Sequence, residues 1–145
     1  VMDCDSQHPP YMINDFLNQP TDINLIYGKR NFANPMPIKR IISNYLSSKL
    51  ISLIYNKKIL DSQCGFRRYK IKDIIFIDTK ENGYQYETEI LLHLLNANFK
   101  FKHVRIPTIY SNEISNINAP SDALAFIKLI ITLPYYNMKY DKKIK

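Results

Sequence analysis

Two aspartates and a glutamine stand at every second position near the start of the sequence, in the stretch VMDCDSQHPP. In an extended strand, Asp3, Asp5 and Gln7 project from one face, and Cys4 and Ser6 project from the other. Two carboxylates and an amide oxygen form a hard-oxygen site, which suits Mg²⁺ or Mn²⁺ with phosphate oxygens and water as further ligands. The spacing predicts a divalent-cation site at the end of a strand, where open α/β sheets place their ligands.

Other interpretations of the same stretch were weighed. An EF-hand loop requires Gly at its sixth position and Glu at its twelfth, and here those positions are His8 and Asn14. A phosphatase-type Asp nucleophile normally has Thr or Val two residues after the second Asp, where this chain has Gln7. Solvated acids in a turn are the simplest alternative, and the stretch alone leaves that alternative open.

The stretch VMDCDSQHPP resembles the metal-binding Asp-x-Asp segment of family 2 glycosyltransferases with the GT-A fold. The similarity is greatest to dolichyl- and polyprenyl-phosphate mannose and glucose synthases, which have a buried strand, Asp-x-Asp-x-Gln-His-Pro-Pro and a helix. The resemblance implies that Asp3, Asp5 and Gln7 hold the divalent metal of a nucleotide-sugar diphosphate. It also implies that Asp3 and Asp5 contribute to donor binding.

A second segment, DSQCGFRRYK at 61–70, resembles the Asp-x-x-(Ser/Cys)-Gly-Phe-Arg/Lys segment beside the phosphates in that family. The resemblance implies that Arg67 binds phosphate with its rigid fork of donors. It also implies that Asp61 orients the acceptor or a metal-bound water, since a phosphate acceptor is already ionised and scarcely needs a strong base. We therefore expect Asp61 and Arg67, the candidate catalytic residues, to lie near the metal carboxylates. The alternatives are that Asp61 is an acid in a turn and that Arg67 forms an ion pair at the surface.

A third segment, YQYETEILLHLLNANFKFKHVRIPTIY at 84–110, is similar to a Glu-x-Glu helix and the strand that follows it in the same family. Glu87 and Glu89 stand at the helix start, where carboxylates gain from the helix dipole. We therefore expect a structural role for both. We expect His93 and His103 to be partly buried packing residues, because no spacing around them is typical of a zinc site.

The resemblance implies an enzyme that transfers a sugar, with inversion, from a UDP- or GDP-linked donor to a dolichyl or polyprenyl phosphate at the cytoplasmic face of a membrane. Processive synthesis is not expected, because its Gln-x-x-Arg-Trp motif is missing and the sequence has no Trp. The nucleotide-binding first half of the GT-A fold is also not among these residues. We therefore expect residues 1–134 to form the C-terminal half of a GT-A domain and residues 135–145 to form a basic tail. The alternative is an inactive, truncated module that binds a membrane surface or another protein.

The periodicity of the sequence indicates an α/β fold with a mixed central sheet flanked by helices. A stripe of seven apolar residues in 38–58 is expected to face the core, and Pro134 is expected to end the last helix. Strands are expected up to residue 4 and at 22–30 and 99–110, and residues 59–70 are expected to be a loop that enters a further strand. Helices are expected at 9–19, 38–58, 70–77, 87–99 and 122–134, and a loop is expected at 111–121.

Composition supports a globular protein of 145 residues with 46% hydrophobic residues and a net charge of +7. The basic residues are scattered along most of the chain, so no nucleic-acid partner is expected. The two cysteines are expected to be reduced and buried. The last helix is apolar nearly all round and precedes the basic run KYDKKIK. We therefore expect residues 121–145 either to dock on an anionic membrane or to pack against protein.

Overall fold

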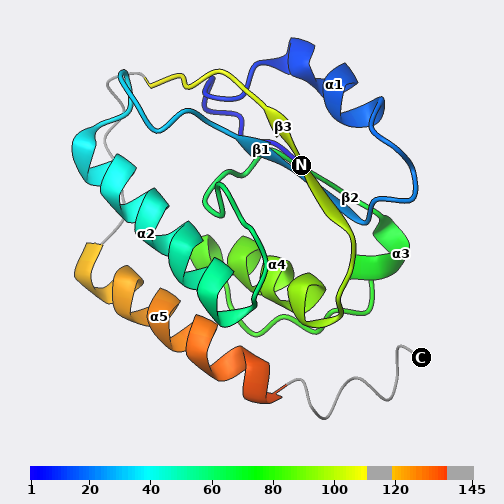
Figure 1. Cartoon of the computed structure of the whole chain (residues 1–145), viewed down its shortest axis with the longest axis vertical. Helices are drawn as coiled ribbons and strands as arrows, with labels where there is room; N and C mark the ends of the chain where they lie inside the picture. Colours follow the sequence, from blue (N-terminus) through cyan, green and yellow to red (C-terminus); the bar gives the residue numbers. More distant parts are fainter. Residues whose placement is uncertain (111–118, 137–145) are drawn as a thin grey trace.

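The computed structural model describes residues 1–110 and 119–136, and it has a mixed α/β fold (Figure 1). Most of the expected loop at 111–121 and most of the expected basic tail at 135–145 lie outside the described residues. The expectation is wrong for residues 119–121, which begin α5. The described helices and strands follow the order expected from the sequence, apart from the opening strand. The α/β class is therefore confirmed at the level of a small mixed sheet with flanking helices.

The sheet has three strands in the order β2-β1-β3. Strand β1 (Leu25–Lys29) is central and pairs antiparallel with β2 (Arg67–Tyr69) and parallel with β3 (Phe101–Arg105). Leu25 is the register partner of Tyr69 on one side and of Phe101 on the other. Because a central strand has neighbours at both edges, β1 fixes the position of the other two strands.

Helices cover both faces of this sheet. Leu25 and Tyr27 of β1 join a core with α4 and α5, whereas Ile26 points to the opposite face and joins Phe16 of α1. Adjacent strand residues point to opposite faces, so this split accounts for the burial of three consecutive side chains. The helical segments are η1 (Pro10–Met12), α1 (Ile13–Leu17), α2 (Ile38–Ile54), α3 (Ile71–Ile74), η2 (Gly83–Gln85), α4 (Tyr86–Asn96) and α5 (Ala119–Tyr136).

The helix boundaries confirm most of the expectations. The apolar face of α4 is buried as predicted, with Ile90, Leu91, Leu94 and Leu95 in the core. The expected end of the last helix at Pro134 is wrong, because α5 continues to Tyr136. Among the described helices, none combines the length and apolar character needed to cross a bilayer.

The orientation of α2 is a second correction. The apolar stripe expected to face the core is mostly exposed: Ile38 is 75%, Leu46 58% and Leu53 67% accessible. The buried side includes Asn44, Ser48 and Ile51.

A hydrogen-bonding requirement accounts for this orientation. The hydroxyl of Ser48 accepts the Ser62 N–H at 2.9 Å, and the hydroxyl of Ser52 accepts the Ile59 N–H at 3.0 Å. Buried N–H groups need acceptors, and α2 supplies them to the loop before β2 by turning its serines inward.

Replacing Ile51 and Ile42 in turn tests the orientation of α2. Ile51 has no solvent exposure and Ile42 is 53% exposed. Ile51→Ala should lower the free energy of unfolding by about 2–5 kcal/mol, because it leaves a cavity in the core. Ile42→Ala should change it by at most about 0.5 kcal/mol. Urea unfolding followed by circular dichroism measures both, and a larger loss for Ile42→Ala would contradict the orientation.

Candidate functional site

The opening stretch does not form the strand that the sequence predicts. Val1 is 71% exposed, although its ammonium donates to the Arg67 carbonyl at 2.8 Å and its carbonyl accepts the Arg67 N–H at 2.9 Å. Residues 4–8 form a bend, and Ser6 has a positive φ of 66°. The buried strand expected to end at residue 4 is therefore wrong, although the main chain of Val1 does pair with β2.

Local hydrogen bonds close this bend. A carboxylate oxygen of Asp5 accepts the Gln7 N–H at 3.0 Å, and Nδ1 of His8 accepts the Asp3 N–H at 3.1 Å. Such side-chain acceptors compete with extended pairing. The flat strand face expected for Asp3, Asp5 and Gln7 is therefore not formed. Across residues 1–110 and 119–136, no three His, Cys, Asp or Glu side chains are grouped as a metal site would need.

The first two motifs nevertheless pack directly against each other. A Cβ added to Gly65 would lie 2.5 Å from Oδ2 of Asp3, closer than real side chains approach. Gly65 therefore makes room for the Asp3 carboxylate against the backbone of the second motif. Asp3 remains accessible, with its side chain 52% exposed. This contact joins segments that are about sixty residues apart in the sequence at the surface around Asp3.

His8 and Cys64 lie beneath this surface. Nδ1 of His8 is 3.6 Å from a carboxylate oxygen of Asp3, and Nε2 is 3.9 Å from the sulfur of Cys64. Burial lowers the pKa of His8 and raises the pKa of Cys64 to about 11. The neutral thiol is a poor nucleophile, so this Cys–His–Asp arrangement is a packing cluster. The expectation for the cysteines is confirmed for buried Cys64 and is wrong for exposed Cys4.

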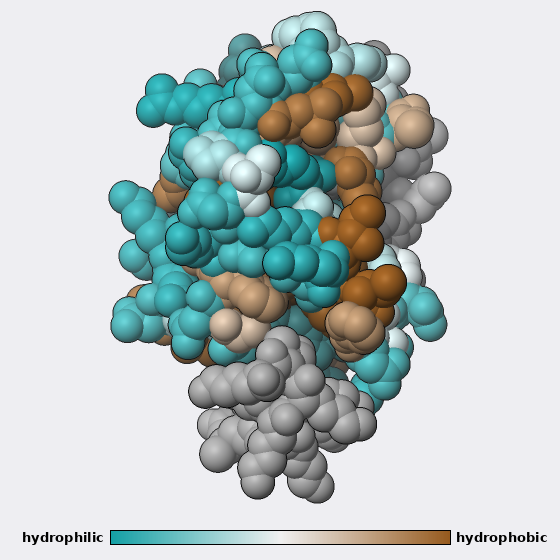
Figure 2. Space-filling model, turned by 90° about the vertical axis from the view of Figure 1, so that its right-hand side faces the viewer, coloured by the Kyte–Doolittle hydropathy of each residue, from teal (hydrophilic) through white to brown (hydrophobic). Residues whose placement is uncertain are grey.

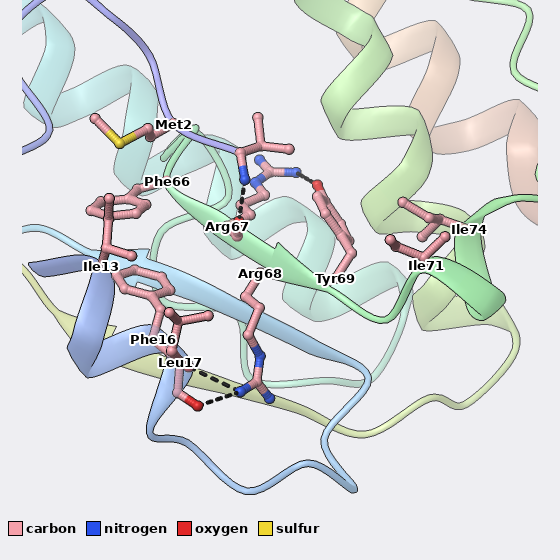
Figure 3. A pocket seen from close by; sticks show the side chains of 11 residues that line it. Met2, Ile13, Phe16, Leu17, Phe66, Arg67, Arg68, Tyr69, Ile71 and Ile74 are labelled. Atoms are coloured by element: carbon pink, nitrogen blue, oxygen red, sulfur yellow. Dashed lines mark hydrogen bonds between the residues drawn. The ribbon is translucent and has the colours of Figure 1, made fainter. Parts of the chain in front are cut away.

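Arg67 joins the second motif to the third. Its Nε donates to the Cys64 carbonyl at 2.8 Å, and Nη2 donates to the Ser62 carbonyl at 2.9 Å. Nη1 donates to the Glu87 carbonyl at 2.7 Å and to the Tyr69 hydroxyl at 3.2 Å, the latter drawn in Figure 3. The guanidinium is buried, and these bonds use most of its donors inside the protein. Its contacts support a positioning role, and the expected phosphate contact stays a prediction.

Glu87 also belongs to the Arg67 cluster, and the sequence did not predict this contact. Its carboxylate is 32% exposed and lies 3.6 Å from Nη2 of Arg67. Burial raises the pKa of Glu87, the positive charge of Arg67 opposes that rise, and the negative charge of Asp3 adds to it. Glu87 is thus electrostatically coupled to a predicted metal ligand. Glu89 has the expected structural role, because its buried carboxylate accepts the N–H groups of Lys80 and Glu81.

Asp61 is fixed by a partner that the sequence analysis missed. Nε of Arg30 donates to Oδ2 of Asp61 at 2.8 Å, and Nη2 donates to Oδ1 at 3.0 Å. The main-chain N–H of Arg30 adds a third bond to the same carboxylate at 3.2 Å. Asp61 is 1% exposed, and this two-pronged pair gives both of its carboxylate oxygens a charged hydrogen-bond donor. Its geometry supports a role in holding the loop before β2, and its expected contact with an acceptor or metal-bound water stays a prediction.

An apolar groove of about 350 Å³ lies beside this cluster (Figure 3). Helix α1, strand β2 and helix α3 supply most of its lining, with Phe66 stacked on Phe16 at a ring-centre distance of 4.1 Å. Arg68 closes one side by donating to the carbonyls of Phe16 and Leu17. Figure 2 views the side of the molecule that carries α1 and α3, and hydrophobic side chains gather along one border of that otherwise mostly hydrophilic face.

Comparison with known proteins adds no assignment: no protein-family model, curated protein or solved structure matches the chain.

Breaking the Arg30–Asp61 pair tests how much this pair contributes to the free energy of unfolding. Asp61→Ala leaves a buried guanidinium without its counter-ion, and it should lower the free energy of unfolding by about 3–5 kcal/mol. The double variant Arg30→Met/Asp61→Leu should recover part of that loss. Asp22→Ala is the matched control, because it breaks an exposed ion pair that Lys100 makes at the same 2.8 Å distance. It should change stability little. Equal losses in Asp61→Ala and Asp22→Ala would contradict the assignment.

Thiol labelling tests the packing of the Cys64–His8 cluster. With a disulfide reagent at pH 8, the exposed Cys4 should react quickly and the buried Cys64 should react only after unfolding, because its pKa is raised to about 11. Cys4→Ser should abolish the rapid phase, and Cys64→Ser should leave it unchanged. Rapid reaction of two thiols in the native wild-type protein would rule out the inert arrangement.

Proposed function

We propose that this chain is part of a family 2 glycosyltransferase of the GT-A type, which transfers a sugar with inversion from a UDP- or GDP-linked donor to a dolichyl or polyprenyl phosphate. The observation that carries the proposal is the packing of Asp3 against Gly65, which brings the Asp-x-Asp and Asp-Ser-Gln-Cys-Gly-Phe-Arg motifs into one surface. Arg67 extends that surface to Glu87 in the third motif. Three segments that each resemble one family thus lie close together in space.

The carboxylate and amide oxygens on this surface are of the chemical type that binds a hard divalent cation. Asp3 is accessible and Asp5 is partly buried, and carboxylate and amide oxygens are preferred ligands of Mg²⁺ and Mn²⁺. In the proposed enzyme Asp3, Asp5 and Gln7 hold the metal, and the bound metal neutralises charge on the donor diphosphate. Gly65 supports the arrangement because it gives the Asp3 carboxylate space beside the second motif.

The buried charged residues prepare this surface. The Arg30–Asp61 pair and the guanidinium of Arg67 fix the loop 61–66 against β1 and α4. Within the proposal, Asp61 orients the acceptor or a metal-bound water, and Arg67 contributes positive charge next to the phosphates. A preorganised charge requires no reorganisation during the reaction, which favours transfer.

The proposed setting is the cytoplasmic face of a membrane, where a lipid-phosphate acceptor is available. An inactive interaction module is the second candidate, and the many internal hydrogen bonds of Arg67 favour it, because they use donors that a phosphate would need.

Manganese binding and sugar transfer test the proposal together. Electron paramagnetic resonance of free Mn²⁺ measures binding to the chain, and transfer from UDP-glucose or GDP-mannose to a polyprenyl phosphate is assayed with and without EDTA. The transfer assay is run on the chain alone and with the nucleotide-binding half of a family 2 synthase supplied separately. Asp5→Asn should weaken Mn²⁺ binding at least about tenfold, because it removes a charged ligand, and should abolish most transfer.

Asp15→Asn is the control, because Asp15 is an exposed acid of α1 outside the motif. It should behave as wild type in both assays. Undiminished Mn²⁺ binding by Asp5→Asn, or transfer that persists in EDTA, would refute the metal-dependent function.

A further inference from the structure

Helix α2 presents an apolar stripe to solvent. Ile42, Leu46 and Leu53 recur at intervals close to whole helical turns, and they are 53%, 58% and 67% exposed. The opposite side of the helix is buried and includes Asn44 and Ser48. Helix α2 therefore exposes an apolar stripe while it buries the polar side chains of Asn44 and Ser48.

Helix α5 packs beside α2 and repeats this feature (Figure 1). Leu124, Ile127 and Ile131 form a second helical stripe and are 70%, 43% and 50% exposed. We define the six residues Ile42, Leu46, Leu53, Leu124, Ile127 and Ile131 as the α2–α5 apolar face. Because the two helices are in contact, exposed apolar side chains on both of them indicate an interaction surface.

The charges on α2 and the segments that flank it have one sign. Residues 23–60 include no Asp or Glu, whereas they include seven Lys or Arg residues. Lys39 and Lys49 of α2 and Lys128 of α5 are exposed beside the apolar stripes. Apolar side chains bordered by lysines are the pattern of helices that lie in the plane of a membrane interface, where cations attract anionic headgroups.

We propose that the α2–α5 apolar face docks on an anionic lipid surface, with its apolar side chains entering the headgroup region and Lys39, Lys49 and Lys128 facing the phosphates. The inference rests on the proposed function, because a lipid-phosphate acceptor lies in a membrane and the enzyme must reach it there. The sequence predicted membrane docking through residues 121–145, whereas in this proposal α2 supplies half of the docking surface. Vesicle binding needs neither metal nor nucleotide-sugar, so it can fail or succeed independently of sugar transfer.

Vesicle flotation of the whole chain tests the proposal. Vesicles of phosphatidylcholine are compared with vesicles that also contain phosphatidylglycerol, at low and high salt. The wild-type chain should float with the anionic vesicles and lose binding at high salt, because salt screens the lysines. Ile42→Ser/Leu46→Ser/Leu53→Ser should weaken that binding about tenfold or more, since it removes three apolar side chains from the contact. Lys39→Glu/Lys49→Glu should weaken binding to the vesicles that contain phosphatidylglycerol, and it should not change any binding to phosphatidylcholine vesicles.

The matched control removes three apolar residues elsewhere that are also more than half exposed. Ile71, Ile75 and Phe76 are 74%, 65% and 79% exposed and belong to α3 and the segment after it, on the other side of the molecule in Figure 1. Ile71→Ser/Ile75→Ser/Phe76→Ser should bind within about twofold of wild type. Circular dichroism checks that each variant is folded.

Three results would overturn the proposal. The first is that the wild-type chain does not bind anionic vesicles, and the second is that the α2 and α3 triple variants lose binding equally. The third comes from sedimentation velocity: a wild-type dimer that the α2 triple variant dissociates, with vesicle binding unchanged, would identify the face as a contact between two copies of this chain.

Discussion

The buried guanidinium of Arg67 is the contact on which the arrangement of the three motifs depends. A buried positive charge is costly unless hydrogen-bond acceptors surround it. Here the acceptors are carbonyls of the loop before β2 and of α4, together with the Tyr69 hydroxyl. The same residue exchanges two main-chain hydrogen bonds with Val1. The guanidinium therefore fixes the loop and the start of α4 relative to each other, and the main chain of the same residue fixes the opening residues.

Burial separates the charged groups of the candidate site into two sets. Asp61, Arg30 and Arg67 are nearly inaccessible and bind one another or the main chain. Asp3 lies at the surface, where it packs against Gly65 and is close to His8. The inaccessible set gives rigidity, and the accessible carboxylate is available to a ligand. Two acids with similar sequence surroundings thus have different uses because of their depth.

The sequence was sufficient to predict features that depend on nearby residues. The periodicity of α4 identified its buried side, and the apolar residues of β1 identified the strand. The direction of α2 could not be predicted in this way, because it depends on which N–H groups of a separate loop need acceptors.

The candidate site also combines features that the local sequence predicts with features that depend on distant segments. The motifs predicted that Asp3 and the segment 61–70 belong to one candidate site, but nothing in the local sequence indicates that Arg30 pairs with Asp61 or that Glu87 lies beside Arg67. The bend at residues 4–8 was missed because short side chains can hydrogen-bond to the main chain, and that competition with extended pairing is not visible in an alternating pattern.

The central position of β1 has a consequence for how the molecule acquires its structure. Its two partners, β2 and β3, come much later in the chain, so the sheet forms only when distant segments meet. Contacts of high sequence separation form slowly because a long loop must close first. Helices α2 and α4 depend on local contacts and can form earlier. During synthesis, β1 therefore has both its neighbours only after residue 105 has been added, and until then its parallel edge is open to pairing with other chains.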